Sequence, residues 1–154
     1  MSKHSVTHAT FVIEREYDHA PRRVFRAFED TDAKRKWFIG GKGWDIEDYQ
    51  TDFKVGGYER SRFRFKGGPL VTNDTSYHDI VPNERIIIAY WMMVGESRIS
   101  SSLATIEFKA AGKGTRLIFT EQGAFLDGHD NVAQREEGTR GLLEALEIYL
   151  RANS

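Results

Sequence analysis

The sequence predicts an α+β fold in which a curved antiparallel sheet of about seven strands wraps around a long C-terminal helix. Between residues 44 and 122 apolar and polar side chains alternate with a period of two, which is typical of half-buried strands, and glycines separate these stretches. Near the C-terminus the period becomes helical, with Leu142, Leu143, Leu146, Tyr149 and Leu150 on one face. A sheet and a helix that each have one apolar face bury both faces by packing together.

Two short helices are expected between the first strand and the second. Residues 9–17 alternate as a strand, and Pro21 then suits the first turn of a helix, where its missing N–H costs nothing. Thr31 is a residue type that caps helices, so a second helix is expected to start there and to end at Trp37-Phe38. The basic run 34–36 lies near its C-terminal end, where the helix dipole favours cations.

The remaining strands are expected at 44–54, 57–66, 70–81, 85–94, 98–110 and 114–122. Turns are expected at Gly40-Gly41, Gly56-Gly57, Gly67-Gly68 and Gly112-Lys113-Gly114. The connections are short, so most pairs should be antiparallel. The final helix starts either at Asn131, which forms a capping box with Gln134, or at Asp130.

Composition excludes several classes of protein. The chain has 154 residues, which predicts a single domain over 1–154, and its 22 Lys and Arg against 23 Asp and Glu argue against a strong nucleic-acid binder. There is no cysteine, so disulfides and thiolate metal sites are excluded. The longest apolar run, Ile86–Val94, is too short to span a bilayer as a helix, and the N-terminus has no signal-peptide pattern. We therefore expect a cytoplasmic protein without a membrane span.

Five short blocks carry a resemblance to a known family. They are Asp18–Phe28 (DHAPRRVFRAF), Trp37-Phe38, Gly56-Gly57, Asp79–Ile86 (DIVPNERI) and Gly114–Leu117 (GTRL), and they occur in this order across residues 9–150. With these blocks the chain resembles the START-like (birch-pollen-allergen-like, SRPBCC) superfamily. Within it, the chain resembles the bacterial branch named after the activator of the heat-shock-protein-90 ATPase.

The resemblance implies the helix-grip fold, which is shared by START lipid-transfer domains, pollen allergens and bacterial polyketide cyclases. It implies a small hydrophobic or aromatic ligand, lipids included, held between sheet and C-terminal helix. The chain departs from the family in two respects. It has no room for the separate amino-terminal domain of the eukaryotic co-chaperone, and Gly138 is followed by Thr139 where many relatives carry Gly-Trp.

Strand parity selects the polar groups that should face such a cavity. Glu121 shares parity with the apolar Phe119, and Glu59 shares parity with Phe63 and Phe65, so both carboxylates should point inward. A buried carboxylate is costly unless it is paired, hydrogen-bonded or protonated. Glu121 is therefore the best candidate for a general base, the catalytic residues being otherwise unknown. The alternative is that both carboxylates lie near strand ends and reach solvent.

The predicted ligand-binding residues combine the inward parity positions, the strand aromatics and the helix positions that face the sheet. They are Trp37, Trp44, Glu59, Phe63, Phe65, Tyr90, Met92, Ser102, Phe119, Glu121, Phe125, His129, Gly138 and Leu142. Neither His78 nor His129 has a second histidine at a zinc-site spacing, and there is no nucleotide-binding glycine motif, so we expect no metal and no cofactor.

Three alternatives remain open at the level of sequence. The same cavity could serve a cyclase, dehydratase or hydrolase. Three arginines, Arg60, Arg62 and Arg64, share one strand face, which is either a solvated surface or a patch for an acidic partner such as a chaperone. Whether the protein forms a homodimer is equally open. The stretch Gly123–His129, with glycines near both ends, is either a movable lid or an ordinary connection.

Overall fold

In a computed structural model, residues 3–39 and 41–153 form one curved sheet, two short helices and one long helix. The predicted turn residue Gly40 lies outside the described residues. The strands are β1 (Val6–Tyr17), β2 (Trp44–Thr51), β3 (Tyr58–Phe65), β4 (Val71–Val81), β5 (Arg85–Val94), β6 (Ser97–Ala111) and β7 (Gly114–Leu126). The helices are α1 (Pro21–Glu29), α2 (Thr31–Trp37) and α3 (Val132–Ala152). The predicted α+β fold is confirmed.

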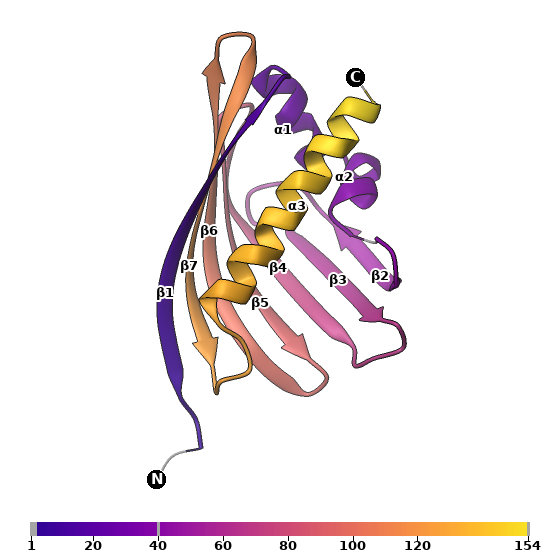
Figure 1. Cartoon of the computed structure of the whole chain (residues 1–154), viewed down its shortest axis with the longest axis vertical. Coiled ribbons are helices and arrows are strands. Elements are labelled where there is room, and N and C mark those ends of the chain that lie inside the picture. The colour runs from indigo at the N-terminus through magenta and orange to yellow at the C-terminus, as the bar shows by residue number, and fades with distance from the viewer. Residues whose placement is uncertain (1–2, 40, 154) are drawn as a thin grey trace.

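The sheet is antiparallel throughout and has the order β1-β7-β6-β5-β4-β3-β2. Strands β2 to β7 pair with their neighbours in sequence, whereas β1 pairs with β7, from Val6 against Leu126 to Tyr17 against Thr115. In Figure 1, α3 runs diagonally across the concave face, with α1 and α2 beside its C-terminal half. The helices therefore cover one face of the sheet and leave the other open to solvent.

The helix starts show which capping residues are used. The side chain of Asp30 accepts from the backbone N–H of Asp32 at 3.0 Å, so the cap of α2 is Asp30, one residue before the expected Thr31. For α3 the cap is Asn131, whose side chain accepts from the N–H of Gln134 at 2.9 Å. Asp130, the other candidate, is thereby left free to make a different contact, described below.

Aromatic side chains fill the space where α1 and α2 meet the sheet. Phe28 packs edge-on against Trp37 and Phe108, with ring centroids 4.9 and 5.4 Å apart, and Phe25 packs against Phe108 at 5.4 Å. Tyr17 donates from its hydroxyl to the carbonyl of Leu143 at 2.9 Å and so joins β1 to α3. Aromatic packing fills this end of the molecule, and Phe28 and Trp37 also form part of the wall of the cavity described below.

The stretch Gly123–His129 was expected to be a loop or lid, and this expectation is wrong for its first half. Residues 123–126 continue β7 and pair on both sides, with β1 and with β6. Gly123 is required there by a close approach, because a Cβ atom at this position would lie 2.9 Å from the ring of Phe125. Its glycine therefore serves packing within a strand and provides no hinge.

None of the described helices is long and apolar enough to cross a membrane.

Candidate functional site

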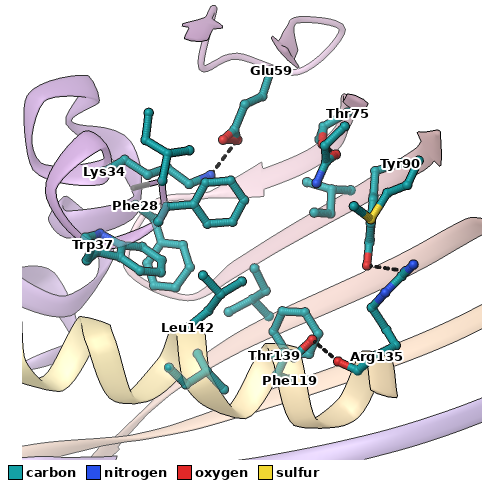
Figure 2. A pocket seen from close by; sticks show the side chains of 18 of the residues that line it. Phe28, Lys34, Trp37, Glu59, Thr75, Tyr90, Phe119, Arg135, Thr139 and Leu142 are labelled. Atoms are coloured by element: carbon teal, nitrogen blue, oxygen red, sulfur yellow. Dashed lines mark hydrogen bonds and ion pairs between the residues drawn. The ribbon is translucent and has the colours of Figure 1, made fainter. Parts of the chain in front are cut away.

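A cavity of about 470 Å³ lies between the concave face of the sheet and α3, and α2 closes one end (Figure 2). Most of its wall is apolar, and includes Phe28, Trp37, Ile88, Phe119 and Leu142. The charged side chains on the wall form two pairs, Lys34 with Glu59 and Asp130 with Arg135, and the wall also holds the polar residues Asn73, Thr75, Gln134 and Thr139. This combination of an apolar body with a few placed polar groups is typical of a small-molecule site.

The first polar group is centred on Glu59 of β3. Its carboxylate is buried and accepts three hydrogen bonds, from the Lys34 ammonium at 2.5 Å and from the hydroxyls of Tyr49 and Tyr77, both at 2.9 Å. Burial raises the pKa of Tyr49 and of Tyr77, and the adjacent Glu59 charge raises both further. The two phenols therefore remain protonated donors that hold the Glu59 carboxylate in place.

The second polar group is centred on Arg135 of α3. One terminal nitrogen of its guanidinium donates to the hydroxyl of Tyr90 at 2.9 Å and to Glu121 at 3.2 Å. The other donates to Ser100 and to Asp130, both at 2.7 Å. Tyr90 in turn donates to Glu121, its hydroxyl lying 2.8 Å from both carboxylate oxygens. One cation thus joins two carboxylates, a phenol and a serine at the start of α3.

The charges of this group depend on one another. Burial raises the pKa of Glu121, and the Arg135 charge and the Tyr90 hydrogen bond oppose that rise. Burial also raises the pKa of Tyr90, and Glu121 raises it further. For Arg135, burial acts to lower the pKa, but Tyr90, Glu121 and Asp130 outweigh it and leave the pKa raised. Arg135 therefore stays charged and keeps its carboxylate partners.

Nine of the residues predicted to bind a ligand lie on the cavity wall: Trp37, Trp44, Glu59, Phe63, Tyr90, Met92, Phe119, Gly138 and Leu142. The parity argument is correct for the direction of both carboxylates, since Glu59 and Glu121 are buried on the concave side. Five predicted residues are not on the wall: Phe65, Ser102, Glu121, Phe125 and His129.

Each of the five has a structural reason. Phe65 is the last residue of β3, where it is half-exposed and packs on Trp44 of the edge strand β2 with ring centroids 4.9 Å apart. Glu121, Ser102 and Phe125 are fully or almost fully buried within the layer between sheet and α3. His129 is exposed in the turn before α3.

Sequence reasoning missed Lys34, Arg135 and Asp130. Arg135 continues the buried stripe of α3 toward its start, because 135, 139, 143 and 146 lie at intervals of three and four residues. A charged side chain at an apolar position of that pattern was a signal for a buried ion pair. Lys34 lies one turn before the buried Trp37, and the same argument applies to it. Asp130 carries no such signal, because it precedes the helix.

The arginines of β3 lie on the outer face, as predicted, but each faces an acidic side chain on a neighbouring strand. Arg62 forms two hydrogen bonds with Asp74, at 2.9 and 3.3 Å, and Arg64 meets Glu47 at 2.7 Å. The row does not present unpaired positive charge to an acidic partner. In the described part of the chain, no three His, Asp or Glu side chains gather in a way that could hold a metal ion.

The fold, with a cavity between the sheet and α3, defines a helix-grip protein, in which a curved sheet wraps around a C-terminal helix. The chain belongs to the family described as Activator of Hsp90 ATPase homolog 1-like protein, whose model matches residues 18–151. None of the curated proteins matches the chain significantly.

Solved structures agree with this assignment. The chain is similar to protein Mll3558 from Rhizobium loti, with 51% identity and a TM-score of 0.88 over 94% of this chain and 99% of that one. A protein from Rhizobium leguminosarum is 46% identical, with a TM-score of 0.93 over 97% and 98%. CalU16 from Micromonospora echinospora, at 17% identity and a TM-score of 0.65 over 96% and 84%, shares the fold alone.

Proposed function

We propose that the protein binds a small hydrophobic or aromatic molecule in the cavity between the sheet and α3. The observation that carries the proposal is the cavity itself: about 470 Å³ of space with a mostly apolar wall. Such a volume lies within the range of about 300–1,000 Å³ that ligand sites occupy. Unfilled apolar space costs a protein stability, on the order of 24 cal/mol per Å³ in cores, so its retention favours a site that an apolar ligand fills.

Binding is favoured over catalysis because the carboxylates near the cavity already have partners. Glu121, the candidate base, lies off the wall and is held by Tyr90 and Arg135. Within the described residues, the two acidic side chains on the wall are each paired with a cation, Glu59 with Lys34 and Asp130 with Arg135. A general base needs a free lone pair directed at its substrate.

We also propose that the chain forms a single domain over 1–154 and that the protein is cytoplasmic. Pairing of β1 with β7 joins sequence-distant parts of the chain in one sheet and supports a single domain over 1–154. The proposed cytoplasmic location is one that a cysteine-free composition also suits. Cell fractionation with an antibody against the protein tests it.

Two glycines of α3 provide a matched test of the binding site. Gly138 lies on the cavity wall and Gly141 lies off it, and a Cβ atom at either position would meet nothing within 4 Å. Gly138→Leu should therefore fill part of the cavity without disturbing the helix, and Gly141→Leu should leave the cavity unchanged. The probe is N-phenyl-1-naphthylamine, a neutral aromatic dye that fluoresces in apolar surroundings.

The expected result is saturable dye binding by the wild type and by Gly141→Leu, and binding weakened at least about tenfold, or about 1.4 kcal/mol, by Gly138→Leu. Equal binding by all three proteins would place the dye elsewhere and reject the cavity as the site. Native mass spectrometry of the gently purified protein complements the titration, because a reproducible adduct of a few hundred daltons would identify a bound molecule directly.

A further inference from the structure

Of the charged side chains on the cavity wall, Lys34 is one that keeps donor capacity for a ligand. It projects from α2 into the cavity wall and is almost fully buried. An ammonium group has three N–H donors and no acceptor. The described residues offer it one acceptor, the Glu59 carboxylate at 2.5 Å, and one aromatic face, the ring of Phe38 with its centroid 4.4 Å away. At least one N–H is therefore left for a ligand.

At the opposite end of the cavity, the terminal N–H donors of Arg135 are already engaged. The two terminal nitrogens of Arg135 carry four N–H donors, and the described structure supplies four acceptors for them, on Tyr90, Glu121, Ser100 and Asp130. Tyr90 uses its own proton toward Glu121. The four terminal N–H donors of Arg135 and the Tyr90 proton are therefore engaged by protein partners and are not offered to a ligand.

The charge of Lys34 is already balanced. Glu59 lies in direct contact, and the hydroxyls of Tyr49 and Tyr77 hold its carboxylate in a fixed position. A second anion placed against Lys34 would also face the Glu59 charge and would lose its own hydration. A neutral acceptor oxygen gains a hydrogen bond from the ammonium without that repulsion.

We propose that Lys34 anchors the ligand by donating a hydrogen bond to a neutral acceptor oxygen, so that the ligand class is aromatic ketones, aldehydes and esters. This inference rests on the proposed binding function and adds the chemistry of recognition. The aromatic body of the ligand lies against the apolar wall, and its oxygen points to the α2 end of the cavity, where Figure 2 shows Lys34 beside Glu59.

Three compounds of similar shape test the anchor by isothermal titration calorimetry. They are 2-acetylnaphthalene, with a neutral acceptor oxygen, 2-isopropenylnaphthalene, in which a CH₂ group replaces that oxygen, and the anionic 2-naphthoate. The wild type should prefer the ketone about tenfold over the other two, the effect expected of one hydrogen bond of about 1.4 kcal/mol. Lys34→Met should abolish the preference, whereas Lys36→Met, the same change at an exposed position of α2, should keep it.

Lys34→Met alone leaves the Glu59 carboxylate buried without its cation, so the double variant Lys34→Met/Glu59→Gln accompanies it, and circular dichroism confirms that both are folded. In the double variant the alkene should bind as tightly as the ketone. Equal binding of all three compounds by the wild type would overturn the anchor and leave the proposed function intact. Failure of the wild type to bind any of them would overturn both. A preference that survives in folded Lys34 variants would assign the anchor to another residue.

Discussion

Replacing Glu121 with leucine tests whether the group around Arg135 is held together by charge. The variant leaves a buried guanidinium that has lost one of its two carboxylates. Breaking a buried ion pair from one side costs about 3–5 kcal/mol. Asp130 still contacts Arg135 at 2.7 Å, so we expect the lower end, about 3 kcal/mol. For a chain of this length that corresponds to a fall of about 6–12 °C in melting temperature.

The double variant Glu121→Leu/Arg135→Met separates charge from packing. It removes the cation together with its buried partner, and buried pairs replaced by apolar side chains of similar size are often neutral in stability. Asp130 is then left without Arg135, and its side chain is only 11% exposed, but its carboxylate keeps the hydrogen bond from the backbone N–H of Asn131 at 2.8 Å. We therefore expect the double variant to be more stable than Glu121→Leu alone.

Urea unfolding followed by the fluorescence of the three tryptophans measures both free energies of unfolding. Glu136→Leu is the control, because Glu136 forms an exposed i,i+4 pair with Arg140 at 2.7 Å and should cost at most about 0.5 kcal/mol. The reasoning is refuted if Glu121→Leu costs less than about 1 kcal/mol, or if the double variant is no more stable than Glu121→Leu.

Three further predictions concern other parts of the fold. Ser61→Ala should raise the free energy of unfolding by about 0.5–1 kcal/mol, because the Ser61 hydroxyl is buried without a hydrogen-bond partner in the described structure; a loss in urea unfolding would contradict this. Gly57→Ala should destabilise the protein by more than about 3 kcal/mol, because its Cβ would lie 2.1 Å from a backbone oxygen. Gly141→Ala in α3 should instead stabilise the protein by about 0.5–1 kcal/mol, and thermal melts compare the two variants. The backbone N–H of Ser5 is the main cause that lowers the pKa of Asp127. This hydrogen bond should therefore persist below the usual pKa of an aspartate and be lost only as the pH falls through the lowered value. An NMR titration in which the Ser5 amide follows an ordinary aspartate pKa would refute this prediction.

The architecture was predictable because hydrophobic periodicity is a local property of the chain. The change from a period of two to a helical period located α3, and the inward parity of Glu59 and Glu121 was correct for the same reason. The end of β7 was misplaced because Gly123 resembles a turn residue in sequence, whereas its role is set by the Phe125 ring packed against it. Such a contact is a property of the packed structure and has no local signal.

The site was predictable only in part, because hydrogen-bond partners are chosen in three dimensions. Glu121 was expected to face the cavity, but its carboxylate accepts a hydrogen bond from Arg135, one turn into α3, and does not line the cavity. Nothing local in sequence places residue 135 against residue 121 or residue 34 against residue 59. The cation at each carboxylate decides whether the acid can act as a base, and both cations were missed.

The pairing of β1 with β7 has a consequence for how the protein is made. The strand that is synthesised first forms an edge of the sheet, and its partner is β7, which begins at Gly114. During synthesis β1 leaves the ribosome early, and its backbone has no strand to pair with until β7, the last strand, has been made. Pairings this distant in sequence close slowly. Until then β1 is an unpaired strand with the apolar side chains of Phe11 and Ile13 exposed, and this is the stage at which the growing chain is most open to aggregation.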